Sequence, residues 1–227
     1  IAGKVLSKNE IPALQRLVQK SKFLQKIIKH GGTEKSFQFD PKIFLRGSDL
    51  YLDGYWQSPK YFTGLEDIIR RDFTLKGPLP ENILVLGEEI KKTNSVCVHV
   101  RRGDYVGNKS HEVVTLEYYQ KGIKYISEKT SIEKIYVFSD DIKWCQENFS
   151  FEMPTMFVDE SFAGWAGEGH MFLMSQCKNF VIANSSFSWW AAWLSNYKNK
   201  IVVCPLQWFP DRSINTSDLI PQEWVRI

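Results

Sequence analysis

The residues best suited to chemistry in this chain are two adjacent arginines, Arg101 and Arg102, followed by Gly103 and Asp104. The apolar run at 95–100 just before them is typical of a buried strand, so we expect the guanidinium groups where that strand leaves the core. A guanidinium matches phosphate oxygens two hydrogen bonds at a time and stays charged at physiological pH. The pattern predicts an anion site. The alternatives are a surface salt-bridge patch or a chance Arg-Gly-Asp tripeptide, and integrin binding fits a strand end poorly.

Two further strand candidates also end in small polar side chains. These residues are Ser139, Asp140 and Asp141 after the strand at 135–138, and, after the strand at 180–183, the run 184–188, in which Asn184, Ser185, Ser186 and Ser188 accompany the apolar Phe187. Ligands of open parallel sheets bind beyond the carboxyl ends of the strands, and a helix N-terminus favours phosphate. Helix capping explains one such end, but three on one edge predict an anionic ligand. With arginines present, a ribose, guanine or capping role for the Asp pair is favoured over a metal. The chain has no Gly-x-Gly-x-x-Gly motif and no Walker lysine, which disfavours a dinucleotide or P-loop site.

Strand and helix patterns alternate regularly from residue 95 onward. The expected strands are 96–100, 135–138, 155–158, 180–183 and 201–204, and the expected helices are 115–128, 142–148, 169–176 and 188–195. This alternation predicts βαβ units with right-handed crossovers and a mostly parallel sheet covered on both faces. We therefore expect an α/β protein with a complete Rossmann-like domain at 93–227, while 1–92 forms part of another, N-terminal domain.

The N-terminal part has a different texture. Helical spacing is expected at 9–30, 58–73 and 81–92, and a strand at 43–45. Residues 1–36 carry eight Lys or Arg against two Glu. This imbalance is typical of a solvated helix face, with a docking face as the alternative.

Composition excludes several classes of protein. At 227 residues and 43% hydrophobic content the chain can bury one good core or two small ones. A net charge of +3 is too slight to argue for nucleic acid. No apolar run approaches the ~20 residues of a membrane span, and no signal-peptide pattern opens the chain. The four cysteines are far apart and read as buried thiols of a reducing compartment. Some of the many aromatics are expected to line a sugar site, because flat rings pack on the apolar faces of pyranoses.

Three segments resemble the signature blocks of the α-1,2-fucosyltransferases, glycosyltransferase family 11. They are Val98 to Tyr105, Phe138-Ser139-Asp140, and the long block from Leu173 to Leu194, with Asn184-Ser185-Ser186-Phe187-Ser188-Trp189-Trp190-Ala191-Ala192-Trp193 at its centre. Gly54-Tyr55-Trp56-Gln57-Ser58 with Tyr61-Phe62 is similar to a segment that the family carries upstream. The resemblance covers most of residues 50–210, in order and at similar spacing.

The resemblance implies a GT-B architecture of two Rossmann-like domains, GDP-β-L-fucose as donor, inversion at the fucose anomeric carbon, no cofactor and no required metal. The implied acceptor is the 2-hydroxyl of a terminal β-galactoside on a glycan. Arg101 and Arg102 would bind the diphosphate, with His99 near the nucleotide. The other implied donor-site residues are Ser139, Asp140, His170, Asn184, Ser185, Ser186, Phe187 and Ser188, and the acceptor side would involve Trp56 and Tyr105. We expect a cytoplasmic bacterial enzyme with no nucleic-acid partner. Any association with a membrane is expected to be peripheral, at the inner membrane.

The chemistry fits the residues independently of the resemblance. Negative charge grows on the departing β-phosphate, so Arg102→Ala is expected to reduce turnover by about two to three orders of magnitude. The acceptor hydroxyl must also lose a proton. Asp104 is the favoured base, with His99, His111 and Glu112 as alternatives, although Asp104 equally suits a role in ordering an arginine.

Two departures from the family pattern keep other functions open. The chain has no Gly-Gly-Leu-Gly-Asn-Gln loop, so the N-terminal domain is expected to be incomplete. His170, with Glu168 nearby, stands where an acidic residue would suit guanine, so guanine preference has less support than diphosphate binding. The alternatives are a non-catalytic nucleotide-sugar or glycan-binding module, and a GT-B transferase that uses another nucleotide sugar.

Overall fold

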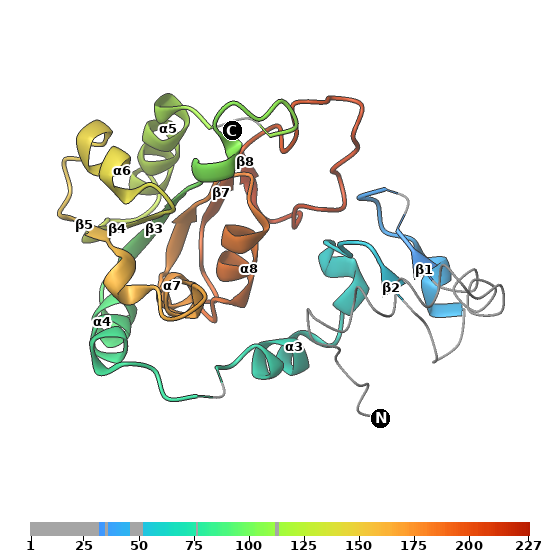
Figure 1. Ribbon diagram of the computed structural model, residues 1–227, viewed down its shortest axis with the longest axis horizontal. Coiled ribbons are helices and arrows are strands. Elements are labelled where there is room, and N and C mark those ends of the chain that lie inside the picture. Colours follow the sequence, from blue (N-terminus) through green and yellow to red (C-terminus); the bar gives the residue numbers. More distant parts are fainter. Residues whose placement is uncertain (1–31, 35, 46–51, 76, 112–113) are drawn as a thin grey trace.

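The computed structural model describes residues 32–34, 36–45, 52–75, 77–111 and 114–227, and a six-stranded sheet lies at its centre (Figure 1). All neighbouring strands are parallel. Across the sheet they run β5 (Thr155–Val158), β4 (Lys134–Ser139), β3 (Ser95–Val100), β6 (Asn179–Val181), β7 (Val202–Cys204) and β8 (Val225–Arg226). Counted from β3, this is the 3-2-1-4-5-6 order of a Rossmann-type sheet. The order reverses between β3 and β6, where such sheets hold their ligands.

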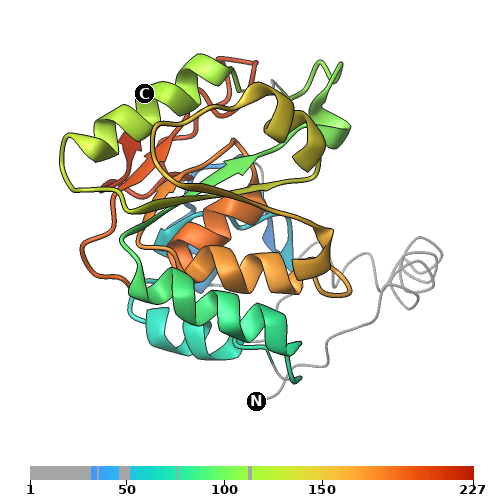
Figure 2. The ribbon, with the colours of Figure 1, turned by 90° about the vertical axis from the view of Figure 1, so that its left-hand side faces the viewer.

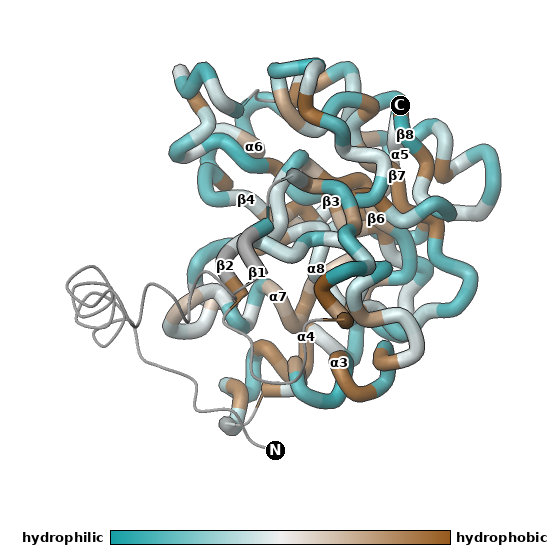
Figure 3. The backbone as a smooth tube through the Cα atoms, turned by 90° about the vertical axis from the view of Figure 1, so that its right-hand side faces the viewer, coloured by the Kyte–Doolittle hydropathy of each residue, from teal (hydrophilic) through white to brown (hydrophobic). Residues whose placement is uncertain are grey.

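Helices cover both faces of the sheet (Figure 2). One face carries α5 (Leu116–Ser127) and α6 (Ile142–Asn148), and the other carries α4 (Glu81–Lys92), α7 (Glu168–Gln176) and α8 (Ser186–Leu194). Side chains alternate along β3, so Val96 and Val98 pack into the core beneath α5 and α6. Cys97 packs into the core beneath α4, α7 and α8. Burial on both faces explains why the central strands are mostly apolar, whereas the outer loops are mostly hydrophilic (Figure 3).

The predicted α/β architecture is confirmed for the part of the chain after residue 80. The five expected strands and five expected helices of that part are present, and helices 81–92 and 142–148 have the predicted bounds. Strand β8 was not predicted. It is only two residues long, which is too short for a periodicity to show.

Two predictions for the N-terminal part are wrong. Residues 43–45 belong to a 3-10 helix, η1 (Pro41–Leu45), which begins at a proline whose fixed φ suits a helical turn. The predicted helix 58–73 is split into η2 (Pro59–Phe62) and α3 (Glu66–Asp72), with Gly64 at φ +81° between them. The predicted helix 9–30 lies outside the described residues. The remaining elements are β1 (Gly32–Thr33) paired with β2 (Leu52–Asp53), η3 (Gly103–Tyr105) and η4 (Glu160–Phe162).

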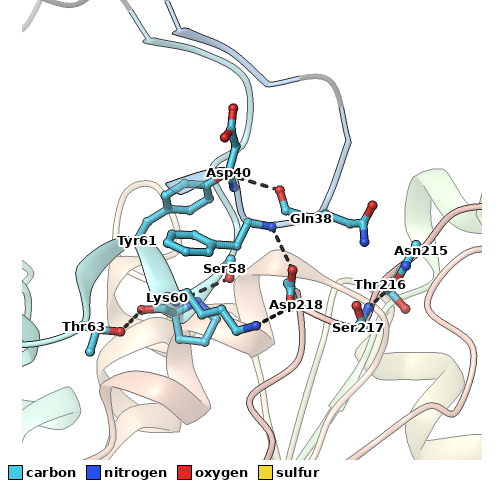
Figure 4. A network of polar contacts seen from close by, with 12 residues as sticks. Gln38, Asp40, Ser58, Lys60, Tyr61, Thr63, Asn215, Thr216, Ser217 and Asp218 are labelled. Carbon is cyan, nitrogen blue, oxygen red and sulfur yellow. Dashed lines mark hydrogen bonds and ion pairs between the residues drawn. The ribbon is translucent and has the colours of Figure 1, made fainter. Parts of the chain in front are cut away.

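A carboxylate near the C-terminus fastens the N-terminal segment to the sheet domain (Figure 4). Asp218 accepts a hydrogen bond from the Phe39 backbone N–H at 3.0 Å and pairs with the Lys60 ammonium at 2.5 Å. Lys60 first, and then the Phe39 N–H, lower the pKa of Asp218. These contacts bring residues near 39 and 60 against the loop that contains residue 218.

All four cysteines are buried and unpaired, as the sequence predicts. Among the described residues no helix has both the length and the apolar character needed to cross a bilayer.

Close packing between α5 and β6 predicts the effect of a single methyl group. A Cβ at Gly122 would lie 2.6 Å from Cγ1 of Val181, a β-branched side chain with little rotameric freedom. Gly122→Ala should therefore destabilise the fold by about 1–3 kcal/mol in urea unfolding, although alanine is the better helix former. Gly77→Ala is the control, because no described residue other than its chain neighbours comes within 4 Å of its added Cβ. Equal stability of the two variants would contradict this packing.

Candidate functional site

A single aspartate shapes the turn that carries the two arginines. Asp140 follows directly after β4, and its Oδ1 accepts a hydrogen bond from the Arg102 backbone N–H at 2.9 Å. Its Oδ2 lies 3.2 Å from Nη1 of Arg101. A Cβ at Gly103 would lie 2.6 Å from the same Oδ2, so only glycine allows this close approach. The sequence left the role of Asp140 open, and in the structure it holds the arginine turn.

The two guanidinium groups have separate surroundings. Arg101 pairs with Asp104 at 2.7 Å and lies 5.5 Å from the centre of the Tyr105 ring. The Arg102 guanidinium pairs with Asp141 at 3.2 Å and lies 3.7 Å from the centre of the Trp144 ring on α6. The two arginines are therefore adjacent in sequence, but their guanidinium groups are held by different partners and do not form one paired anion-binding group.

Arg101 lines a cavity of about 430 Å³ at the carboxyl ends of β3 and β4. Its walls are His99, Arg101, Phe138, Ser139, Asp140, Glu160, Ala163, Gly164, Trp165, Ala166, Gly167, His170 and Phe187. The volume falls within the range typical of small-molecule sites. The cavity thus brings together six of the predicted donor-site residues, while Arg102 lies on the α6 side of the turn.

His99 forms a neutral part of the cavity wall. Burial first, then the positive charge of Arg101 and then His170, lower its pKa to about 3. Its Nδ1 is buried without a hydrogen-bond partner among the described residues, and its ring centre lies 5.9 Å from that of Phe187. Such a ring is a weak base, which disfavours the predicted proton-accepting role. It is well suited to hydrogen-bond a polar atom of a ligand.

His170 presents an acceptor. Its Nε2 lies 2.9 Å from the backbone carbonyl oxygen of Asp159, and a carbonyl can only accept a hydrogen bond. The Nε2 atom therefore carries a proton, and in the neutral ring Nδ1 is left as an acceptor. An acceptor at this position suits an N–H group of a bound base.

A glycine-flanked loop forms the rim of the cavity. The carboxylate of Glu168 accepts hydrogen bonds from the backbone N–H groups of Trp165 and Ala166, at 2.9 and 2.7 Å, and these bonds lower its pKa. Gly164 and Gly167 take positive φ values of 76° and 89° on either side. Glu168 therefore serves the loop, whereas the Trp165 side chain, at 99% exposure, stands free at the rim.

Most of the run 184–188 is structural. Asn184 donates to the Trp208 carbonyl at 3.1 Å, and Ser188 Oγ donates to backbone carbonyls at 3.2 and 3.3 Å. Ser185 is buried and Ser186 is exposed at the first position of α8, and Ser185 makes no side-chain capping bond. Of these five residues, Phe187 alone lines the cavity.

The two predicted acceptor residues have different neighbours. Tyr105 is next to Arg101, and its hydroxyl donates to the Asn184 carbonyl at 3.1 Å. The Trp56 ring packs edge-on against Tyr61 at 5.2 Å, and its backbone adopts φ +49°, a left-handed value rare outside glycine. Trp56 does not line the cavity.

Sequence reasoning missed Phe138 and Trp165 as site residues. Phe138 had a usable signal, because it stands opposite His99 in the register of β3 and β4 and so shares its face. Trp165 gave none, because it lies in an irregular loop. Over the described ranges, no group of three or more His, Cys, Asp or Glu side chains is placed to hold a metal ion. The predicted independence of metal is not tested by this.

A Rossmann-type sheet with a cavity at the carboxyl ends of its strands is the arrangement in which many nucleotide-binding domains hold their ligands. The profile described as glycosyl transferase family 11 matches residues 6–227. The chain belongs to this family, which confirms the resemblance seen in the sequence.

Three relatives illustrate the match. The α-1,2-colitosyltransferase of Escherichia coli is 40% identical over 205 residues, which cover 85% of this chain and 68% of that protein. The O-antigen biosynthesis glycosyltransferase WbnK of E. coli is 40% identical over 60% of this chain and 46% of its own. A galactoside 2-α-L-fucosyltransferase of Caenorhabditis elegans is 27% identical over a region that covers 84% of this chain and 57% of that protein. The match thus spans between about half and two thirds of these proteins.

A solved structure of POFUT1 in complex with GDP shows a looser likeness. Its TM-score is 0.39 at 12% identity, over 82% of this chain and 78% of that one.

The neutral state of His99 predicts a pH dependence of stability. Because its pKa falls from 6.5 to about 3 on folding, the unfolded chain binds a proton first as the pH drops. The contribution of His99 to the free energy of unfolding is therefore fully present above pH 6.5 and is lost as the pH falls toward 3. Between about pH 7 and about pH 5 the wild type should lose about 2 kcal/mol more than His99→Asn, measured by urea unfolding at each pH. Parallel curves for the two proteins would contradict a neutral, buried His99.

Proposed function

We propose that this chain carries the donor site of an α-1,2-fucosyltransferase, which moves L-fucose from GDP-β-L-fucose to the 2-hydroxyl of a terminal β-galactoside. The observation that carries the proposal is the cavity at the carboxyl ends of β3 and β4, with Arg101 in its wall, in a chain of glycosyl transferase family 11. The nucleotide would lie between His99, His170 and the rim loop. The β-phosphate would lie toward Arg101 and the first turn of α8.

The proposal includes a GT-B architecture. Residues 93–227 would form the donor domain, and residues 1–92 would contribute to an acceptor-side domain. Within the second range, α4 packs against α7 through Ile83, Leu86 and Ile90, so it also supports the donor domain. Transfer would proceed with inversion and without a required metal, because guanidinium charge at the cavity takes the place of a cation on the diphosphate.

Arg101 would act on the leaving group. As the bond between the fucose anomeric carbon and the β-phosphate oxygen breaks, negative charge grows on that oxygen. The pairs with Asp104 and Asp140 hold the guanidinium beside the cavity before substrate arrives, so little reorganisation is needed during the reaction. The acceptor oxygen forms the new bond to the anomeric carbon and gives its proton to a base.

Two of the four predicted bases, Asp104 and His111, remain candidates for the proton acceptor. His99 is too weak a base at a pKa of about 3, and Glu112 lies outside the described residues. Asp104 is exposed at the end of the turn, the His111 ring stacks on Tyr105 at 4.3 Å, and neither residue lines the cavity. Either group is close enough to the arginine turn to meet an acceptor hydroxyl.

A second donor sugar has a specific observation in its favour. The E. coli relative that is 40% identical over 85% of this chain is an α-1,2-colitosyltransferase. Colitose and fucose are both deoxy sugars of the L-galactose series, so the same cavity and arginine would serve either donor. Only contacts to the sugar ring would separate them.

A donor and acceptor panel tests the proposal. GDP-fucose, a nucleotide-activated colitose, GDP-mannose and UDP-galactose are each offered with lactose or N-acetyllactosamine, and release of the nucleoside diphosphate is followed. We expect acceptor-dependent release from GDP-fucose. Binding of GDP in calorimetry without release from any donor would instead establish a non-catalytic binding module.

Removing Arg101 should slow transfer sharply. Arg101→Ala takes away the cation at the leaving phosphate, and kcat should fall by about 10²–10³-fold. Circular dichroism checks that the variant is folded, and Arg71→Ala, at an exposed arginine paired with its neighbour Asp72, is the matched control. A rate for Arg101→Ala within a few-fold of wild type would remove the phosphate role of this residue. Arg102→Ala tests the original sequence prediction separately.

A further inference from the structure

A groove of about 690 Å³ lies between the segment that joins α3 to α4 and the helices α7 and α8. Its walls also include Leu84 and Lys91 of α4 and the loop after α8. The volume is within the range of small-molecule sites. The described residues that line the groove include none of those that line the cavity at Arg101. We call this feature the apolar groove.

Half of the residues that line the apolar groove have apolar side chains, and several of these remain open to solvent. Met171, Phe172 and Leu194 are partly buried against the core. Phe73, Leu75 and Leu84 are more open, with exposed fractions of 50, 39 and 47%. Exposed apolar side chains that line one groove suggest that an apolar partner covers them.

The charge on the apolar groove has one sign. Among the described residues that line it, Arg70, Lys91 and Lys178 are cations and none is Asp or Glu. The three cations come from α3, from α4 and from the position just before β6. Lys91 has a carboxylate nearby, Glu88 at 3.7 Å, but this pair is exposed and therefore weak. Apolar walls with positive charge match a molecule that has a hydrocarbon chain and an anionic head.

The apolar groove lies toward the amino ends of the strands. Lys91 is near the end of α4, which leads into β3, and Lys178 directly precedes β6. The cavity at Arg101 lies instead at the carboxyl ends of β3 and β4. Because all strands of this sheet are parallel, the groove and the cavity are at opposite ends of the strands. A partner bound at the groove would therefore leave the cavity open.

We propose that the apolar groove docks this protein on a bilayer that contains anionic phospholipids. Phe73, Leu75 and Leu84 would enter the interface, an acyl chain would occupy the groove, and Lys91 and Lys178 would lie beside lipid phosphate groups. Exposed Leu and Phe side chains combined with Lys and Arg are typical of surfaces that bind anionic membranes. The inference goes beyond the donor site proposed above, and it gives the peripheral membrane association expected from the sequence a definite surface.

The rival occupant is a second copy of this chain. In a twofold dimer the same patch of each copy faces its equivalent. Such a dimer would bring two sets of Arg70, Lys91 and Lys178 together, and the described lining of the groove has no carboxylate to offset their repulsion. An anionic membrane surface meets the same cations with charge of the opposite sign, so the charge favours the membrane.

The test measures binding of the full chain to lipid vesicles by flotation. Vesicles of phosphatidylcholine alone are compared with vesicles of phosphatidylcholine mixed with phosphatidylglycerol. Wild type should bind the mixed vesicles, and high salt should weaken this binding because it screens the charges. Lys91→Gln and Lys178→Gln should each lower the partition coefficient about fivefold, since each removes one cation from the anionic surface. Leu84→Ser should lower it about three- to tenfold through the loss of an inserted apolar side chain.

Two matched controls separate this surface from the rest of the molecule. Lys121 lies on α5, on the other face of the sheet, and its side chain is 64% exposed, as is that of Lys91; each pairs with a glutamate of its own helix. Leu206 is 68% exposed in the loop after β7. Lys121→Gln and Leu206→Ser should bind the mixed vesicles as wild type does. Thermal unfolding of all the variants should coincide with that of wild type.

Three results would each overturn the docking surface: no binding to the mixed vesicles, equal binding to both kinds of vesicle, or equal losses in Lys91→Gln and Lys121→Gln. Analytical ultracentrifugation without lipid follows the rival occupant. A dimer that Leu84→Ser disrupts would assign the apolar groove to a second copy and overturn the membrane proposal. No donor or acceptor sugar enters these measurements, so their outcome is independent of the proposed transferase function.

Discussion

The site depends on one carboxylate at the end of β4. Asp140 accepts the Arg102 backbone N–H and pairs with the Arg101 side chain, and its approach is possible only because Gly103 has no side chain. The parallel pairing of β3 with β4 brings these residues together, since Val100 stands opposite Ser139. The sheet register thus determines where the positive charge lies, and Asp140 determines how it points.

Burial divides the roles of the charged and neutral groups around that turn. Arg101 keeps part of its surface exposed and is ion-paired, so its charge is available at the cavity. His99, two residues before Arg101 on β3, is 5% exposed, and its burial together with the charge of Arg101 keeps it neutral. A cavity with one cation and the neutral His99 ring would concentrate its attraction on the phosphate and leave the base to be recognised by hydrogen bonds.

The sheet and its helices were predictable because their signals are local. Strands buried on both faces read as apolar runs, and α4 and α6 have clear starts and ends, so their bounds agree with the pattern. The N-terminal part was predicted poorly because Pro41 and Gly64 act on single turns that a periodicity cannot resolve. Within the site, strand ends were found from the sequence. The direction of the Arg102 side chain was not, because it depends on Trp144, 42 residues further along the chain, and on how α6 packs.

Arg101 contacts two parts of the molecule that are built in different ways, because it lines the cavity and its guanidinium also lies over the Tyr105 ring. The cavity is made by the ends of β3 and β4 and the rim loop, which all belong to the regular sheet domain. The Phe37 ring instead joins the N-terminal segment to the C-terminal loop, because it packs against both Tyr55 and Phe209. The shape of the cavity therefore follows from the sheet register, whereas the N-terminal segment is held by ring contacts and by the Asp218 carboxylate.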